Sequence, residues 1–100
     1  MRLSAAELAK IKITFSHFQS KDAELYLFGS RTDSTKKGGD IDLLIIFKNS
    51  EQSFQFKKLD FLVALKKKLG ERRIDVTIAS EHEIEIDEFL KVAFAGAVKI

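Results

Sequence analysis

The sequence contains no cysteine, no proline and no tryptophan, and it has only one tyrosine. Without cysteine, no disulfide can stabilise the fold, which agrees with a cytoplasmic protein. No apolar run approaches the length of about 18 residues that a membrane span requires, so we expect no transmembrane helix. Residues 1–10 include Glu7 and have no continuous apolar segment, so they do not resemble a signal peptide.

The rest of the composition suits one small folded domain. A chain of 100 residues with 45% apolar residues can build a single core, and we expect one domain over residues 1–100. The net charge of +2 is too small to indicate a nucleic-acid partner by itself.

Hydrophobic spacing and turn residues predict alternating helices and strands. Ser4 and Glu7 have the spacing of a capping box, which marks the start of the first helix. Gly70 is the expected stop of the second helix. The expected elements are helix 4–19, strand 24–28, loop 30–39, strand 41–47, a break at 49–51, helix 54–69, strand 73–79 and helix 87–95. The tail 97–100 either frays or adds a last strand.

The strand at 41–47 is apolar on both faces, which indicates a sheet with helices on both sides. The fold class is therefore α/β (α+β), with a small mixed sheet of three or more strands covered by helices. The sequence leaves open whether the strands 41–47 and 73–79 run parallel.

Three carboxylates mark a candidate site. Asp40 and Asp42 stand at the entry to the apolar strand, and Asp75 stands near the start of a later one. If the strands are neighbours, the carboxylates meet and repel by roughly 3 kcal/mol per pair at a separation of about 5 Å. A hard divalent cation such as Mg²⁺ removes that repulsion. Alternatively, Asp40 is a turn residue, and Asp42 and Asp75 pair with Arg72, Arg73 or lysines.

The segment between the first two strands suits a phosphate group. Gly29 allows close approach of the backbone, and the Ser30 hydroxyl can donate to a phosphate oxygen. Arg31, Lys36 and Lys37 would balance phosphate charge. An ordinary turn followed by a solvated loop explains the same residues.

Taken together, "LFGSR", "GGDIDLLI" and "IDVTI" resemble the polymerase-beta-like nucleotidyltransferase superfamily, and within it the minimal nucleotidyltransferase branch. The family pattern is Gly-Ser, a short polar segment, Asp-x-Asp and a third carboxylate on a later strand. Gly29, Ser30, Asp40, Asp42 and Asp75 match it in order and spacing. The sequence departs from the pattern after Arg31, where Asp33 replaces a residue that is often basic.

The resemblance implies a nucleotidyltransferase-like fold. It also implies transfer of a nucleoside monophosphate, expected to be AMP, from a nucleoside triphosphate such as ATP to a hydroxyl. Asp40, Asp42 and Asp75 would hold two Mg²⁺ ions, and Asp75 could instead accept the proton of the hydroxyl. Gly29, Ser30 and Arg31, with Lys36 and Lys37, would hold the phosphates. His17 and His82 have no evident catalytic partner.

The same branch also implies a partner protein with a HEPN domain, towards which the small transferase acts as antitoxin. Aromatic side chains could form the contact surface, although ordinary core positions explain them equally. These residues are Phe54, Phe56, Phe61, Phe89 and Phe94.

Two other functions stay open: a catalytically silent module that only binds its partner, and a small basic nucleic-acid binder. The second would use lysines and arginines at 57–58, 66–68 and 72–73. The sequence lacks the interleaved aromatic and basic residues of single-strand platforms, which disfavours it. Homo-oligomerisation is also left open.

Overall fold

The computed structural model describes residues 3–18, 23–28, 41–70 and 72–100. The described residues form a four-stranded mixed sheet with the order β3-β2-β1-β4. Strand β2 (Ile41–Phe47) pairs antiparallel with β1 (Glu24–Phe28) and parallel with β3 (Ile74–Ser80). The short β4 (Val98–Lys99) pairs antiparallel with the outer side of β1. The mixed sheet agrees with the expectation from sequence, and of the two alternatives for the C-terminal tail the structure has the strand.

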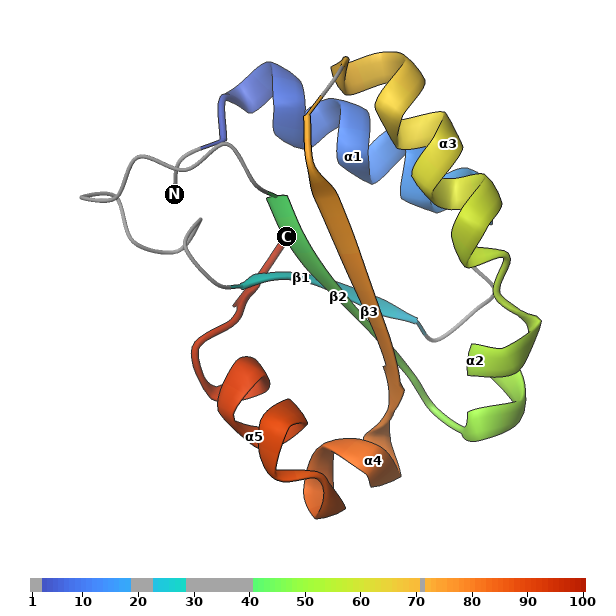
Figure 1. The fold of residues 1–100 in the computed structure, drawn as a ribbon, viewed down its shortest axis with the longest axis vertical. Coiled ribbons are helices and arrows are strands. Elements are labelled where there is room, and N and C mark those ends of the chain that lie inside the picture. The colour runs from blue at the N-terminus through green and yellow to red at the C-terminus, as the bar shows by residue number, and fades with distance from the viewer. Residues whose placement is uncertain (1–2, 19–22, 29–40, 71) are drawn as a thin grey trace.

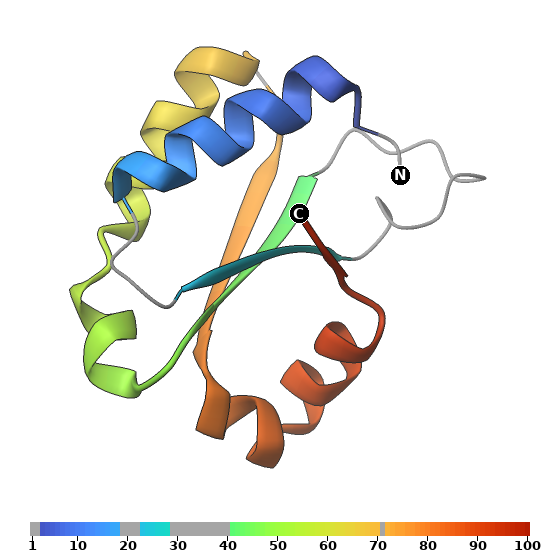
Figure 2. The same ribbon diagram turned by 180° about the vertical axis from the view of Figure 1, so that it is seen from behind.

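Helices cover both faces of the sheet (Figures 1 and 2). Helices α1 (Ala5–Phe18) and α3 (Lys58–Leu69) lie side by side over one face. Helices α4 (Glu81–Ile86) and α5 (Glu88–Ala95) lie against the other face. Six of the seven residues of β2 are apolar, because its alternate side chains face two different helical layers.

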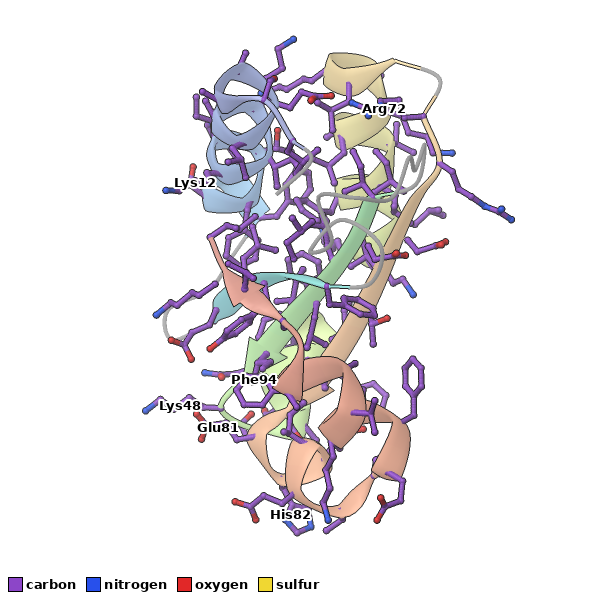
Figure 3. All side chains as sticks on the ribbon, turned by 90° about the vertical axis from the view of Figure 1, so that its left-hand side faces the viewer. Lys12, Lys48, Arg72, Glu81, His82 and Phe94 are labelled. Atoms are coloured by element: carbon purple, nitrogen blue, oxygen red, sulfur yellow. The ribbon has the colours of Figure 1, made fainter. Side chains whose placement is uncertain are left out.

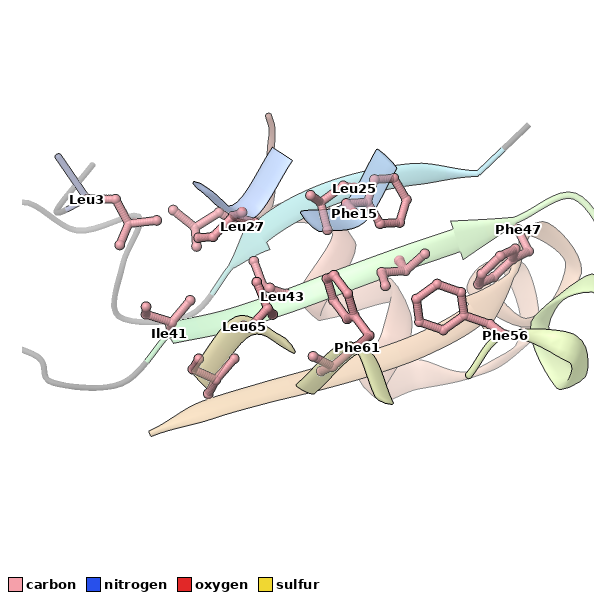
Figure 4. Packing of buried hydrophobic residues seen from close by; sticks show 14 residues of the cluster. Leu3, Phe15, Leu25, Leu27, Ile41, Leu43, Phe47, Phe56, Phe61 and Leu65 are labelled. Atoms are coloured by element: carbon pink, nitrogen blue, oxygen red, sulfur yellow. The ribbon is translucent and has the colours of Figure 1, made fainter. Parts of the chain in front are cut away.

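The larger core fills the space between the sheet and α1 with α3 (Figure 4). Phe61 and Leu65 of α3 and Ile11 of α1 are completely buried there. The smaller core lies on the opposite face, where Leu90 of α5 packs with Leu44, Ile46 and Ala79. At about 25 cal/mol per Å² of apolar surface removed from water, these two clusters are the main stabilising contribution to the fold.

The first helix begins as its sequence predicts. The Ser4 N–H donates to Oε1 of Glu7 at 3.0 Å, and the Glu7 N–H donates to Oγ of Ser4 at 3.1 Å. Glu7 also forms an ion pair with Arg72, which lies just before β3. The residue that starts α1 therefore also ties it to the beginning of the third strand.

The expectation of one helix over 54–69 is wrong. Helix α2 (Ser50–Gln55) comes first, capped by the Asn49 side chain, which accepts from the Gln52 N–H at 2.9 Å. Residues Phe56 and Lys57 separate it from α3. The Phe56 ring is buried, with its centroid 5.4 Å from that of Phe47 and 5.5 Å from that of Phe61. Burial of this ring overrides the helical preference of the segment.

Helix α4 was not expected, since the residues around His82 look like a charged connector. It starts with a reciprocal capping box: the Ser80 N–H donates to Oε1 of Glu83 at 3.0 Å, and the Glu83 N–H donates to Oγ of Ser80 at 3.3 Å. Its six residues are too few to display a helical period. None of the helices in the described ranges is long and apolar enough to cross a membrane.

Gly70 ends α3 in a conformation open almost only to glycine, with φ 84° and ψ −159°. We predict that Gly70→Ala lowers the free energy of unfolding by about 1–3 kcal/mol, the usual cost of such backbone strain. A Cβ at this position would meet no atom within 4 Å, so the loss would come from the backbone alone. Chemical denaturation measures it.

Gly96→Ala is the matched control. Gly96 also ends a helix, but its φ of −97° is open to any residue, and a Cβ there meets nothing within 4 Å either. Equal losses in the two variants would contradict the strain at Gly70.

Candidate functional site

Asp42 and Asp75 are direct neighbours across the β2–β3 pairing. Cross-strand partners lie about 4.8 Å apart and project from the same face of a sheet. Asp42 is half-buried, whereas Asp75 is exposed. The neighbouring strands that the site hypothesis requires are thus present, and the two carboxylates lie in one row near the beginning of both strands.

The pair lies on the face that carries α4 and α5, but before the part that those helices cover. Alternation along β2 puts Asp42, Leu44 and Ile46 on this face. Leu90 of α5 packs against Leu44 and Ile46, further along the strand. The two carboxylates therefore lie nearer to the beginning of the strands than the smaller core does.

The described residues that come directly before and after the segment 29–40 both lie beside Asp42. Phe28, the last residue of β1, is the register partner of Asp42, and Ile41 begins β2. The predicted site residues within this segment lie outside the described residues. They are Gly29, Ser30, Arg31, Lys36, Lys37 and Asp40.

Asp42 and Asp75 supply the oxygen donors that Mg²⁺ prefers. No group of three histidine, cysteine, aspartate or glutamate side chains suited to a metal occurs within the described ranges. The third carboxylate of the hypothesis, Asp40, lies outside them. The donor set that is described fits a hard cation that also takes ligands from substrate, and the metal roles of all three aspartates stay predictions.

Arg72 does not serve as the counter-ion of the aspartates, since its guanidinium pairs with Glu7. No carboxylate-to-cation pair joins Asp75 to another described residue. Arg73 is linked to β2 through its backbone, because the Ile41 N–H donates to the Arg73 carbonyl at 2.9 Å. The alternative of simple ion pairing thus fails for Arg72 and for Asp75 among the described residues.

The histidines lie away from this row and are both exposed. Figure 3 shows His82 at the opposite end of the molecule from Arg72, which precedes β3. His17 lies in the last turn of α1. The absence of a catalytic role for both histidines stays a prediction.

A nucleotidyltransferase domain model matches residues 8–99 of the chain. The chain belongs to the nucleotidyltransferase domain family. The match spans the whole described sheet and all but the first residues of α1, so the family expected from the motifs is confirmed, together with its fold class. Nucleotidyl transfer is accordingly the general activity of this domain. No curated protein matches the chain.

Three of the described residues have shifted pKa values and form a cluster between β1 and β4. Glu24 lies four residues before Phe28, about 13 Å along the strand from the aspartate row. The Lys99 Nζ donates to Oε2 of Glu24 at 2.6 Å, and the Tyr26 O–H donates to Oε1 of Glu24 at 3.5 Å. The bond from Lys99 lowers the pKa of Glu24, and the same bond raises the pKa of Lys99.

This pair stabilises the folded nucleotidyltransferase domain across neutral pH. The lowered pKa of Glu24 means that its contribution is present above the ordinary glutamate range and is lost as the pH falls through the lowered value. The raised pKa of Lys99 means that its contribution is lost only as the pH rises through that value. The cluster anchors the C-terminal strand and takes no part in the aspartate row.

The single tyrosine makes this cluster directly measurable. Burial raises the pKa of Tyr26, the charge of Glu24 raises it further, and the charge of Lys99 opposes the rise. We predict that Glu24→Gln lowers the pKa of Tyr26 and that Lys99→Gln raises it. The ultraviolet absorbance of the phenolate reports the titration of this one residue.

Lys91→Gln on α5 is the control, because Lys91 pairs with Glu88. It should leave the Tyr26 titration where it is. Shifts of the same sign in Glu24→Gln and Lys99→Gln would rule out the described cluster.

Proposed function

We propose that this domain transfers AMP from ATP to a hydroxyl on a partner protein with a HEPN domain and thereby acts as its antitoxin. The observation that carries the transferase part is the in-register pair Asp42 and Asp75 at the start of two adjacent parallel strands. The segment that contains Gly29 and Ser30 joins the same place, since it runs between Phe28 and Ile41.

The difference in exposure between the two aspartates supports a division of roles. The half-buried Asp42, with Asp40, would hold Mg²⁺, and the exposed Asp75 is open to an approaching acceptor. In this division of roles, Asp40 and Asp42 would hold the Mg²⁺ ions, which when bound would neutralise charge on the triphosphate and on the leaving group, and Asp75 would be the base. The Gly29 N–H, Ser30 and Arg31, with Lys36 and Lys37, would orient the β and γ phosphates.

The reaction is one displacement at phosphorus. The acceptor oxygen forms a bond to the α-phosphorus while the bond from that phosphorus to the bridging oxygen breaks. Pyrophosphate leaves, and the hydroxyl proton passes to the Asp75 carboxylate. The acceptor then carries a nucleoside monophosphate in a phosphodiester bond.

Exposed apolar side chains support a protein partner. Phe54 is 87% exposed and Phe89 64%, and Val92 next to Phe89 on α5 is 72% exposed. Phe94 is also partly exposed, at 38%, with its ring against Tyr26. Phe56 and Phe61 are buried, so the surface hypothesis fails for these two residues. The same exposure would serve a silent binding module, and Asp75 distinguishes the two functions.

We predict that Asp75→Asn slows nucleotide transfer at least about a hundredfold, because general-base assistance is typically worth about 10²- to 10⁴-fold. The affinity for ATP should change only a few-fold, since the amide keeps the shape of the side chain. Transfer of α-labelled AMP to the partner protein gives the rate, and calorimetry gives the affinity.

Asp60→Asn provides the control, because Asp60 is an exposed aspartate in the first turn of α3 and its loss changes the net charge equally. It should transfer at the parental rate. If parent and Asp75→Asn neutralise the partner equally well, and neither attaches a nucleotide, the binding module is the function instead.

The phosphate-binding role of Ser30 has its own test. Ser30→Ala should weaken ATP binding by about 1–3 kcal/mol, the range for a lost hydrogen bond to a charged group. The double variant Lys36→Ala with Lys37→Ala should lose less, because fixing a long lysine side chain in an ion pair yields little net free energy. Calorimetry with Mg²⁺ measures both, and equal ATP affinity of parent and Ser30→Ala would exclude this role.

A further inference from the structure

A hollow of about 330 Å³ lies where α3 ends and β3 is about to begin. The described residues that line it are Lys66, Gly70, Arg72 and Arg73. Three of these described residues carry a positive charge, and none of them is aromatic. We call this feature the basic hollow.

The turn at Gly70 builds the basic hollow. The Gly70 N–H donates to the Lys66 carbonyl at 2.9 Å, and the Arg72 N–H donates to the Gly70 carbonyl at 2.8 Å. This reversal returns the two arginines to the side of Lys66. The ion pair with Glu7 then holds Arg72 in place.

The local charge exceeds what the helix alone explains. Residues 66–73 include five cations and one carboxylate, Glu71. Lysines at 66–68 complement the negative end of the α3 dipole, but Arg72 and Arg73 come after the helix. None of the three lysine ammonium groups forms an ion pair with a described residue. The excess of cations over carboxylates in residues 66–73 gives this part of the chain a positive charge that attracts anions.

The basic hollow adjoins β3, the strand that carries Asp75. Arg73 precedes Asp75 by two residues, which is about 7 Å along an extended chain. In the order β3-β2-β1, the segment with Gly29 and Ser30 adjoins β1, whereas the basic hollow adjoins β3. An anion in it would thus lie beside Asp75, where the acceptor hydroxyl approaches.

We propose that the basic hollow binds an acidic segment of the acceptor protein, next to the hydroxyl that receives the nucleotide. That the bound segment belongs to the acceptor protein rests on the proposed function. That the hollow binds an acidic segment does not rest on it. Guanidinium and ammonium groups form their strongest hydrogen bonds with anionic oxygens. Recognition of a single nucleic-acid strand would in addition use stacking aromatic side chains, which the described lining residues lack.

Two fluorescein-labelled peptides test the docking: Glu-Glu-Tyr-Glu-Glu and its counterpart with glutamine at every glutamate. Fluorescence anisotropy without ATP or Mg²⁺ gives their affinities. The acidic peptide should bind the parent more tightly than the neutral one, and added salt should weaken it. The double variant Lys66→Gln with Arg73→Gln should bind it about five- to tenfold more weakly, as expected for two exposed charge contacts.

The matched control is Lys57→Gln with Lys58→Gln, which removes two charges at the opposite end of α3. If the hollow is the site, the affinity of this variant for the acidic peptide should stay within about twofold of that of the parent, since exposed charges outside the hollow contribute little to binding. Arg72 is left unchanged because it pairs with Glu7. Equal loss in both double variants, or equal affinity of the parent for both peptides, would overturn the proposal.

Calorimetry with ATP and Mg²⁺ separates this proposal from the proposed function. The Lys66→Gln, Arg73→Gln variant should keep the ATP affinity of the parent while it loses the peptide. A parent that binds the acidic peptide but not ATP would overturn the proposed function and support the docking site. A single-stranded oligonucleotide that binds the hollow more tightly than the peptide, and accepts AMP at its 3′ end, would overturn the peptide proposal in favour of nucleic acid.

Discussion

The parallel pairing of β2 with β3 is the constraint on which the rest of the structure depends. Its register runs from Ile41 opposite Ile74 to Phe47 opposite Ser80. Because side chains alternate along both strands, this one register places Leu43 beside Val76 in the larger core and Asp42 beside Asp75 on the other face. A slip of one residue would turn Asp75 towards α1 and α3, where an unpaired charge costs far more than it does at an exposed position.

The register is held by the crossover that parallel strands require. Here the crossover consists of α2 and α3, and the short break between them contains Phe56. Its ring packs between those of Phe47 on β2, Phe15 on α1 and Phe61 on α3. Phe56, at the break between α2 and α3, thus holds the beginning of the crossover against β2. The ion pair of Arg72 with Glu7 holds the end of the crossover, just before β3, against α1.

Local chemistry made part of this fold predictable. The capping box at Ser4 and Glu7, the apolar run 41–47 and the glycine stop at residue 70 each depend on a few neighbouring residues, and the structure has these three features at the expected positions. The break at Phe56 depends on tertiary packing of its ring, which the local sequence does not show. The short helix α4 begins with a capping box at Ser80, which is also the last residue of β3, so the sequence alone did not reveal a separate helix. For the same reason, the sequence could not distinguish buried Phe61 from exposed Phe54, since both continue an apolar helical pattern.

The candidate site shows the same division between local pattern and tertiary register. The spacing of Asp40 and Asp42 is readable in the chain, but the pairing of Asp42 with Asp75 exists only through the register of two strands with a crossover between them.

The position of Asp42 and Asp75 also explains how a small domain tolerates carboxylates on its most buried strand and the strand beside it. Ile41 and Leu43 flank Asp42 and are fully buried towards the larger core, while Asp42 projects to the opposite face, before α5 closes over Leu44. Asp42 stands at the beginning of the strand, before the part of this face that Leu90 of α5 covers. The order of the strands places Phe28, the last residue of β1, on one side of Asp42, and Asp75 with the cations before β3 on the other side.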